Sequence, residues 1–304
     1  MTDTWNPSRL YDDYRYASHV PRRGLLVEGR PALSQFDPAK VARYVLLTVR
    51  DPLCAYDDDP AAQLARRLDD AEQIGRSGMF TTWSGSHHGV PVTVVSGGSG
   101  SPEAELIMHE LLEFTEADTF IRVGGSGGYH PKVEPGDVVI SSGVVRDEGM
   151  TQAYIPASYP AVASFEVVVA MARAADRLGR PYHVGVTRSS DSDFCGVGRP
   201  SVGGYFQPWH TDILETWARA GVLNGDRESA AVVTLAALFG KRGGSVCSVA
   251  DNVIAGRPFV AGAGHASGMD IALEGVLELA ALDAEKDAGR GILKSVRNTG
   301  MIDS

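Results

Sequence analysis

The chain has 304 residues, of which 43% are hydrophobic, and this is enough to bury a core in one large domain or two small ones. Its formal net charge is −10 and no long basic run occurs, which argues against nucleic acid as a partner. No apolar stretch approaches the roughly 18 residues of a membrane span, and residues 1–24 lack the apolar core of a signal peptide.

Short β-rich runs alternate with longer helical patterns along the chain, after a polar and aromatic segment of residues 1–40. This alternation predicts an α/β fold with three layers. The strand runs are almost continuously apolar, as expected for strands that are covered on both faces. The predicted strands are 44–49, 90–96, 119–124, 137–141, 182–187 and 244–250. The predicted helices are 101–114, 161–177, 209–220, 228–240 and 268–284.

We expect residues 1–40 to form an extension that wraps the domain or a partner subunit, followed by a catalytic domain (41–290) and a tail (291–304). Residues 53–80 and 196–210 read as long surface segments, and such segments are often functional. The helix at 101–114 is predicted to start with Ser101 as its N-cap and Pro102 as its first residue.

The three cysteines lie far apart and are odd in number, so they fit neither a disulfide framework nor a metal-ligand spacing. We therefore expect no bound metal and a reducing, cytoplasmic location. Cys195 has polar neighbours and is a candidate reactive thiol, whereas Cys247 lies in an apolar run and is interpreted as a buried structural cysteine.

Two glycine-rich stretches favour anion binding. Residues 96–102 (SGGSGSP) link a strand to a helix N-terminus, where free backbone N–H groups and the helix dipole attract anions. Arg122 stands at the end of an apolar strand and precedes a predicted turn of small residues at 124–128. A buried arginine needs a paired anion, which is either a ligand or a structural carboxylate.

Two carboxylate groups complete the candidate site. Asp226, Arg227 and Glu228 crowd a helix start, and a carboxylate there is either an ordinary dipole partner or an acceptor for two sugar hydroxyls. Asp251 and Asn252 end an apolar strand. Asp251 is either a cap of the next turn or an acid whose pKa is raised by partial burial.

The order of several motifs resembles the nucleoside phosphorylase family, and most closely its uridine phosphorylase branch. The motifs are R-V-G-G-S-G-G (122–128), V-E-P-G-D-V-V (133–139), R-D-E-G (146–149), Y-P-A-V-A-S-F-E (159–166), V-G-V-T-R-S-S-D-S-D-F (184–194), D-R-E-S (226–229) and F-T-T-W (80–83). The resemblance implies a three-layer αβα fold with a mixed, partly barrel-like sheet. It also implies a homodimer or homohexamer whose active sites are shared between subunits.

The resemblance implies cleavage of an N-glycosidic bond, with phosphate as co-substrate and no cofactor. In this reading Arg122, Gly125 and Ser126 bind phosphate, Glu228 binds the ribose hydroxyls, and Arg199 reads a pyrimidine ring. Ser126, Gly127 and Phe194 contact the base. Asp251 falls on the aspartate that protonates N7 in purine-cleaving relatives, so Arg199 favours a pyrimidine and Asp251 favours a purine.

The departures from the family pattern fall mostly on the phosphate and sugar contacts. The first phosphate loop, G-D-P-x-R in the family, is here Arg50-Asp51-Pro52-Leu53-Cys54, and Arg50 is the candidate substitute for the lost arginine. Gly78 replaces an arginine lent by a neighbouring subunit, Gly125 a threonine, Leu33 a histidine, Arg227 a methionine and Val197 a glutamine.

These departures leave alternatives open. Each charge-assisted hydrogen bond to phosphate contributes roughly 1.5–3 kcal/mol, so two lost arginines favour water as the nucleophile unless the pocket is rebuilt around Arg50 and Arg122. Arg227 either binds an anionic substrate group or pairs with Asp226. The leading hypothesis is a nucleoside phosphorylase. The alternatives are a nucleosidase, an enzyme that cleaves a modified nucleoside or nucleotide, and a non-catalytic nucleoside-binding protein.

Overall fold

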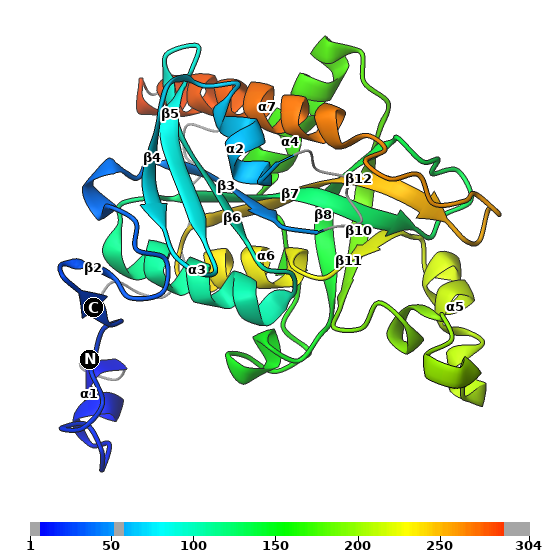
Figure 1. The fold of residues 1–304 in the computed structure, drawn as a ribbon, viewed down its shortest axis with the longest axis horizontal. Coiled ribbons are helices and arrows are strands. Elements are labelled where there is room, and N and C mark those ends of the chain that lie inside the picture. Colours follow the sequence, from blue (N-terminus) through cyan, green and yellow to red (C-terminus); the bar gives the residue numbers. More distant parts are fainter. Residues whose placement is uncertain (1–6, 52–57, 289–304) are drawn as a thin grey trace.

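The computed structural model describes residues 7–51 and 58–288, and Figure 1 shows one central sheet with helices on both faces. The strands are β1 (Leu26–Val27), β2 (Arg30–Pro31), β3 (Tyr44–Val49), β4 (Asp69–Arg76), β5 (Thr81–His87), β6 (Val90–Gly97), β7 (Thr119–Gly128), β8 (Val138–Asp147), β9 (Ala161–Val162), β10 (Tyr182–Ser190), β11 (Val222–Asp226) and β12 (Arg242–Asn252). The α-helices are α1 (Pro7–Asp12), α2 (Pro60–Ala65), α3 (Ser101–Phe114), α4 (Phe165–Leu178), α5 (Ile213–Arg219), α6 (Ser229–Leu238) and α7 (His265–Asp287).

The main sheet runs in the order β11-β10-β8-β12-β7-β3-β6-β5-β4, with β9 beside β8. The sheet is mixed: β11-β10-β8 and β12-β7-β3-β6 are parallel runs, whereas β12 with β8, β5 with both β4 and β6, and β9 with β8 pair in the antiparallel sense. β11 also pairs with β7, so β7, β12, β8, β10 and β11 close into a barrel-like ring. The predicted α/β class with a mixed, partly barrel-like sheet is confirmed.

The sheet lies between two layers of helices, and a cluster of buried apolar side chains fills each of the two interfaces. Helices α2, α4 and α7 pack on one face of the sheet, and α3 and α6 pack on the other (Figure 1). Along β3, Tyr44 and Leu46 enter the first cluster, whereas Val45 and Leu47 enter the second. Side chains alternate between the two faces of a strand, so a strand that is covered on both sides must be apolar at every position.

Every predicted strand and helix is present, but some elements were not predicted. Residues 53–80 read as a surface segment, yet they contain α2 and β4. The prediction was wrong because β4 is a largely exposed, polar strand at the sheet edge, where the alternation that marks a strand is lost. β5 and β11 were also missed. The segment 196–210 does form turns, with short 3₁₀ helices at Cys195–Val197, Val202–Gly204 and Pro208–His210.

Several predicted helix starts need correction, and α7 begins at His265, three residues before its predicted start. Gly100, with φ of 111°, holds the cap position of α3 instead of Ser101, whose hydroxyl donates to the Arg227 carbonyl at 2.6 Å. α4 begins at Phe165, because Ala161–Val162 pairs with β8 as a short strand. α5 begins at Ile213, after a 3₁₀ turn that contains Pro208.

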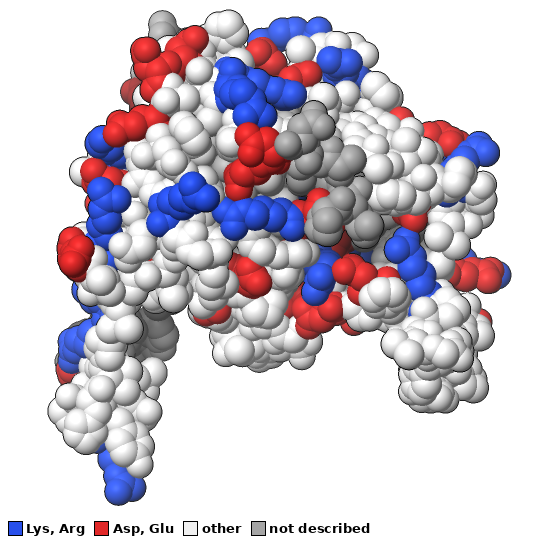
Figure 2. All heavy atoms as spheres, in the orientation of Figure 1, with Lys and Arg blue, Asp and Glu red and all other residues white. Residues whose placement is uncertain are grey.

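The first forty residues contribute α1, the β1–β2 pair and a 3₁₀ turn at Pro38–Lys40, and α1 projects from the domain in Figure 1. Phe36 is fully buried in the core of the domain, so at least part of residues 1–40 packs into that core. The expected domain boundary at residue 40 stays a prediction. Acidic and basic residues are interspersed over the described part of the face in Figure 2, which therefore presents no broad basic surface for nucleic acid. Within residues 7–51 and 58–288, no helix is long and apolar enough to span a membrane.

Candidate active site

A cavity of about 340 Å³ opens beside the ends of β7, β11 and β12 and the loop after β10. β7 and β12 run parallel, so their carboxyl ends meet at one edge, where α/β folds bind ligands. Among the predicted site residues, the lining includes Arg122, Gly125, Ser126, Gly127, Arg199, Arg227, Glu228 and Asp251.

Arg50 and Phe194 are not brought to this lining. All three guanidinium nitrogens of Arg50 are engaged elsewhere, because they donate to Asp59 Oδ2 (2.6 Å), the Met79 carbonyl (2.8 Å) and Thr81 Oγ1. Phe194 is 61% exposed. The idea that Arg50 rebuilds the phosphate pocket therefore finds no geometric support, and Pro52–Cys54 of the same loop lie outside the described residues.

Arg122 and Glu228 form a buried ion pair at the base of the cavity. Nε and Nη2 of Arg122 lie 3.1 and 2.8 Å from Glu228 Oε2, and each side chain is only 3% exposed. Burial raises the pKa of Glu228, but the charge and hydrogen bonds of Arg122 outweigh it, so the pKa lies below its ordinary value. Glu228 is thus held as a carboxylate.

The glycine-serine loop before α3 does bind an anion, and that anion is Glu228. Its Oε1 accepts from the Gly100 backbone N–H at 2.6 Å and from the Ser99 hydroxyl at 3.1 Å. The helix dipole favours negative charge at this position. The two anion-friendly stretches of the sequence therefore meet at one carboxylate, which joins β7 to the start of α3.

A second buried acid, Asp226, lies next to this pair. Its oxygens accept from the hydroxyls of Ser189 and Ser229, and Oδ2 is 3.9 Å from Arg122 Nε. Burial, and then repulsion by Glu228, raises the pKa of Asp226. The adjacent Cys247 is fully buried, as predicted, and this burial raises the pKa of its thiol to about 12.

The small residues after Arg122 are part of β7 itself, which continues to Gly128, so the predicted turn was wrong. The strand is glycine-rich because its neighbours come too close for side chains. A Cβ on Gly124 would lie 1.7 Å from Arg122 Nη1, and one on Gly127 would lie 2.9 Å from Asp251 Oδ1. The Ser126 hydroxyl donates to the Ser248 carbonyl at 2.9 Å and accepts from Asn224.

Asp251 is directed into the cavity by an irregularity in β12. The pairing of β12 with β7 shifts between Val249 and Asp251, and such a bulge re-aims the side chains beside it. Asp251 Oδ2 lies 2.6 Å from Arg199 Nη2. Burial raises the pKa of Asp251, although the Arg199 charge acts in the opposite direction.

Arg227 pairs with Asp193 rather than with Asp226. Its Nη1 lies 3.0 Å from Asp193 Oδ2, and its Nη2 donates to the Asp191 carbonyl at 3.3 Å. Asp193 belongs to the loop after β10, so this pair closes the cavity between that loop and the start of α6. The Arg227 side chain remains 31% exposed.

Sequence reasoning missed several lining residues, among them Tyr129 and Asp193. Tyr129 is 4% exposed, and its Oη lies 3.4 Å from Arg188 Nη1. An aromatic residue directly after the glycine-rich strand was the available signal for Tyr129. Asp193 carries no local signal, because only the folded loop brings it to Arg227.

Two of the replaced family positions lie at the surface. A Cβ on Gly78 would contact nothing within 4 Å, and Leu33 is 38% exposed. Val197, at the position of the family's glutamine, does line the cavity. The departures at Gly78 and Leu33 therefore leave this subunit's own cavity unchanged.

Comparison with known proteins places the chain in a family. A model of the phosphorylase superfamily matches residues 53–267. The chain is 38% identical over 256 residues to a uridine phosphorylase of Thermococcus kodakarensis, which covers 84% of this chain and 89% of that protein. It is 34% identical over 197 residues to a uridine phosphorylase of Haemophilus influenzae, covering 64% and 78%. It is 28% identical over 194 residues to a guanosine phosphorylase of Halorubrum lacusprofundi, covering 64% and 75%. The predicted family is confirmed, and the chain belongs to the phosphorylase superfamily.

Proposed function

We propose that this protein is a nucleoside phosphorylase, which cleaves the N-glycosidic bond of a nucleoside with phosphate and releases the free base and ribose 1-phosphate. It needs no cofactor. The observation that carries the proposal is the buried Arg122–Glu228 pair, which lines a cavity next to the backbone N–H of Gly100. A permanent cation and a hydroxyl acceptor thus stand side by side, as an anionic nucleophile and a ribose require.

Phosphate would bind between Arg122, Gly125, Ser126 and the start of α3. Glu228 now occupies the donors of Arg122 and Gly100, so it acts as an internal stand-in for the anion. When phosphate takes those donors, the Glu228 carboxylate is freed to accept from the 2′- and 3′-hydroxyls of ribose. The negative charge of phosphate, held near the anomeric carbon, would stabilise the positively charged, oxocarbenium-like transition state.

We propose uridine as the first nucleoside to test. The T. kodakarensis relative carries that name and is similar along most of both chains. Arg199, as a multiple donor, would hold the pyrimidine carbonyl oxygens, with Ser126 and Gly127 along the ring. Arg227, still partly exposed, would lie beside the sugar.

A purine nucleoside is the second candidate, because of Asp251. Its pKa is raised by burial, which favours the protonated form that a departing purine needs at N7. The guanosine phosphorylase relative is consistent with this candidate. The pocket holds both Arg199 and Asp251, so guanosine and inosine belong in the same assay.

Hydrolysis is the alternative reaction, since Arg50 is engaged with Asp59 and Arg122 is the predicted phosphate arginine that lines the cavity. The test is to incubate the protein with uridine, guanosine and their 5′-monophosphates, with and without phosphate. Phosphate-dependent release of base with ribose 1-phosphate supports a phosphorylase. Free ribose formed at the same rate without phosphate would assign a nucleosidase, and absence of turnover would assign a binding protein.

We also infer a cytoplasmic homodimer or homohexamer in which subunits share active sites. The N-terminal segment exposes Leu10 (76%), Leu25 (64%) and Leu26 (53%), and a partner subunit would cover these side chains. Light scattering of the full chain against a chain lacking residues 1–27, which removes all three leucines, tests this. A monomer at micromolar concentration in both cases would contradict it.

A further inference from the structure

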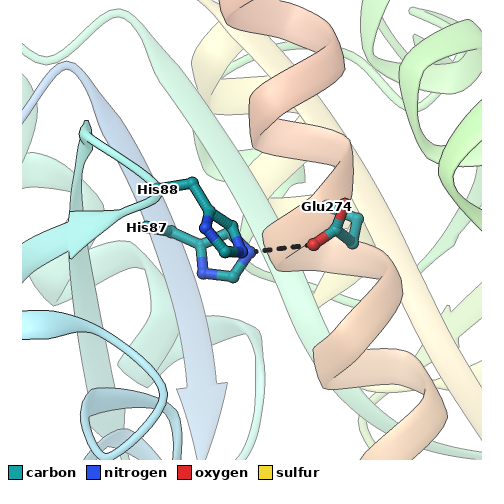
Figure 3. A group of neighbouring side chains, drawn as sticks. All are labelled: His87, His88 and Glu274. Atoms are coloured by element: carbon teal, nitrogen blue, oxygen red, sulfur yellow. Dashed lines mark hydrogen bonds and ion pairs between the residues drawn. The ribbon is translucent and has the colours of Figure 1, made fainter.

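Two histidines and a glutamate meet outside the candidate active site, between the β5–β6 hairpin and α7. His87 ends β5, His88 follows in the turn, and Glu274 lies on α7. A potential ligand atom of each lies within 4.8 Å of those of the other two. Figure 3 shows the two rings and the carboxylate directed toward one another. None of the three lines the cavity described above.

We propose that His87, His88 and Glu274 form a binding site for a divalent transition-metal ion, with Zn²⁺ as the ion of best fit. Imidazole nitrogens suit zinc and its neighbours in the first transition series, and a carboxylate oxygen is a common further ligand. Three protein ligands leave one tetrahedral position for water. The cysteine spacing gave no hint of this site, because its ligands are 187 residues apart in the chain.

The turn geometry brings the two rings to the same side. Consecutive residues of a strand point to opposite faces, so a His-His pair inside a strand would diverge. Here His88 and Gly89 have φ of 47° and 82°, as a tight two-residue hairpin turn requires between paired His87 and Val90. The ring centroids of His87 and His88 are consequently 4.5 Å apart.

The distances fit an ion with little rearrangement. His87 Nε2 lies 3.1 Å from Glu274 Oε1. Ligand bonds of about 2.0–2.2 Å in a tetrahedral site separate neighbouring ligand atoms by roughly 3.3 Å. This pair is therefore already spaced for coordination. His88 is exposed, so its ring is free to make the small rotation that closes the remaining gap.

The surroundings orient the carboxylate. Arg177 Nη1 lies 3.6 Å from Glu274 Oε2, the oxygen that does not face His87, and Arg177 also pairs with Glu278. Outer partners of this kind fix a ligand in its coordinating orientation. The two glutamates outnumber the one arginine, so the local charge still favours a cation. His87 and Glu274 are 13% and 21% exposed, which limits competition from water.

A bound ion would join the hairpin to α7 and stabilise the folded state, because only that state assembles the ligands. The test uses the full, tag-free chain after chelator treatment and dialysis. ZnCl₂ titrated by calorimetry is expected to bind one ion per chain and to raise the unfolding temperature, whereas MgCl₂ is expected to do neither. Phosphorolysis at saturating substrate is expected to be unchanged.

Two variants remove a ligand without removing a buried group. His88→Asn keeps a residue that tolerates positive φ, and Glu274→Gln keeps the shape of its side chain. Each is expected to weaken Zn²⁺ binding at least tenfold. His183→Gln is the matched control, because His183 faces a single carboxylate, Asp137 at 2.8 Å, without a second histidine. It is expected to bind as the unaltered chain does.

Copper binding gives an independent signature. The electron paramagnetic resonance spectrum of the Cu²⁺-loaded chain is expected to show two coupled imidazole nitrogens, and that of His88→Asn only one. The proposal is overturned if Zn²⁺ does not bind at millimolar concentration. It is also overturned if both variants, folded by circular dichroism, bind Zn²⁺ as tightly as the unaltered chain.

Discussion

Arg199 Nη2 lies 2.6 Å from Asp251 Oδ2, so one ion pair joins the loop after β10 to the end of β12. Arg199 is the residue that favours a pyrimidine, and Asp251 is the residue that favours a purine. Because the two side chains already bind each other, a pyrimidine must compete with Asp251 for Arg199, and a purine must compete with Arg199 for Asp251. Replacing either residue therefore tests both base preferences.

Replacing Asp251 by Asn is expected to lower kcat for guanosine or inosine by about 10²–10⁴, because the general acid is lost. The same variant is expected to change uridine cleavage far less.

Replacing Arg199 by Ala removes the charge that lowers the pKa of Asp251, so that pKa rises. An acid is active below its pKa, so the alkaline limb of purine cleavage is expected to move to higher pH. The readout is kcat/KM against pH, and an unshifted limb would contradict the assignment.

Replacing Glu228 by Gln is expected to abolish turnover and to lower the free energy of unfolding by about 3 kcal/mol, because buried Arg122 loses its nearer counter-charge and keeps only Asp226 at 3.9 Å. The double replacement of Arg122 and Glu228 by Met is expected to cost less stability than either single replacement. Urea denaturation of Arg122→Met, Glu228→Met and the double variant measures this. Glu215→Gln, on an exposed pair of α5, is the control and is expected to be neutral. Additive effects would show that the two side chains do not interact.

Replacing Gly124 by Ala would place a methyl group 1.7 Å from Arg122 Nη1 and push the guanidinium away from Glu228. We expect at least a tenfold rise in KM for phosphate. Gly268→Ala is the matched control, since a Cβ there contacts nothing within 4 Å on α7. That variant is expected to keep its KM and gain about 0.5–1 kcal/mol of stability. Equal KM values in the two variants would contradict the role of Gly124.

The fold was readable from the sequence because strands such as β3 are almost continuously apolar and the motifs occur in family order, whereas the polar edge strand β4 was not readable. The cavity lining was predictable where the residues lie in the motifs themselves, as for Arg122, Glu228 and Asp251, whose roles stay predictions. Pairings between motifs were not readable. The sequence offered Arg227 either an anionic substrate group or its neighbour Asp226, whereas the folded loop supplies Asp193. Arg50 was a candidate for phosphate, yet Asp59 takes it because α2 packs beside it.

His265, at the start of α7, is expected to make stability depend on pH. Burial, and then the Arg122 charge, lowers its pKa from 6.5 to about 4. Between these two pH values His265 is protonated in the unfolded chain but neutral in the folded chain. The free energy of unfolding therefore decreases as pH falls from about 6.5 toward 4. The loss is on the order of 3 kcal/mol.

Denaturation of His265→Asn and unaltered protein at several pH values isolates this effect. The variant is expected to show a flatter dependence above pH 5, where few carboxylates titrate. His19→Asn, at an exposed position, is the control and is expected to match the unaltered chain. Parallel curves for all three proteins would exclude His265 as the source.

The register of β7 and β12 also bears on how this site changes during evolution. Gly127 stands opposite Asp251, and Arg122 opposite Ser245, on the same pair of strands, whose register shifts once between Val249 and Asp251. The spacing between the anion end and the base end is consequently set by backbone, which point mutations hardly alter. Arg199 and Asp193 instead come from the loop after β10, which tolerates insertion and substitution. New base preferences are therefore expected to arise by exchange of residues 191–210, while the part of the site on β7 and β12 is inherited unchanged.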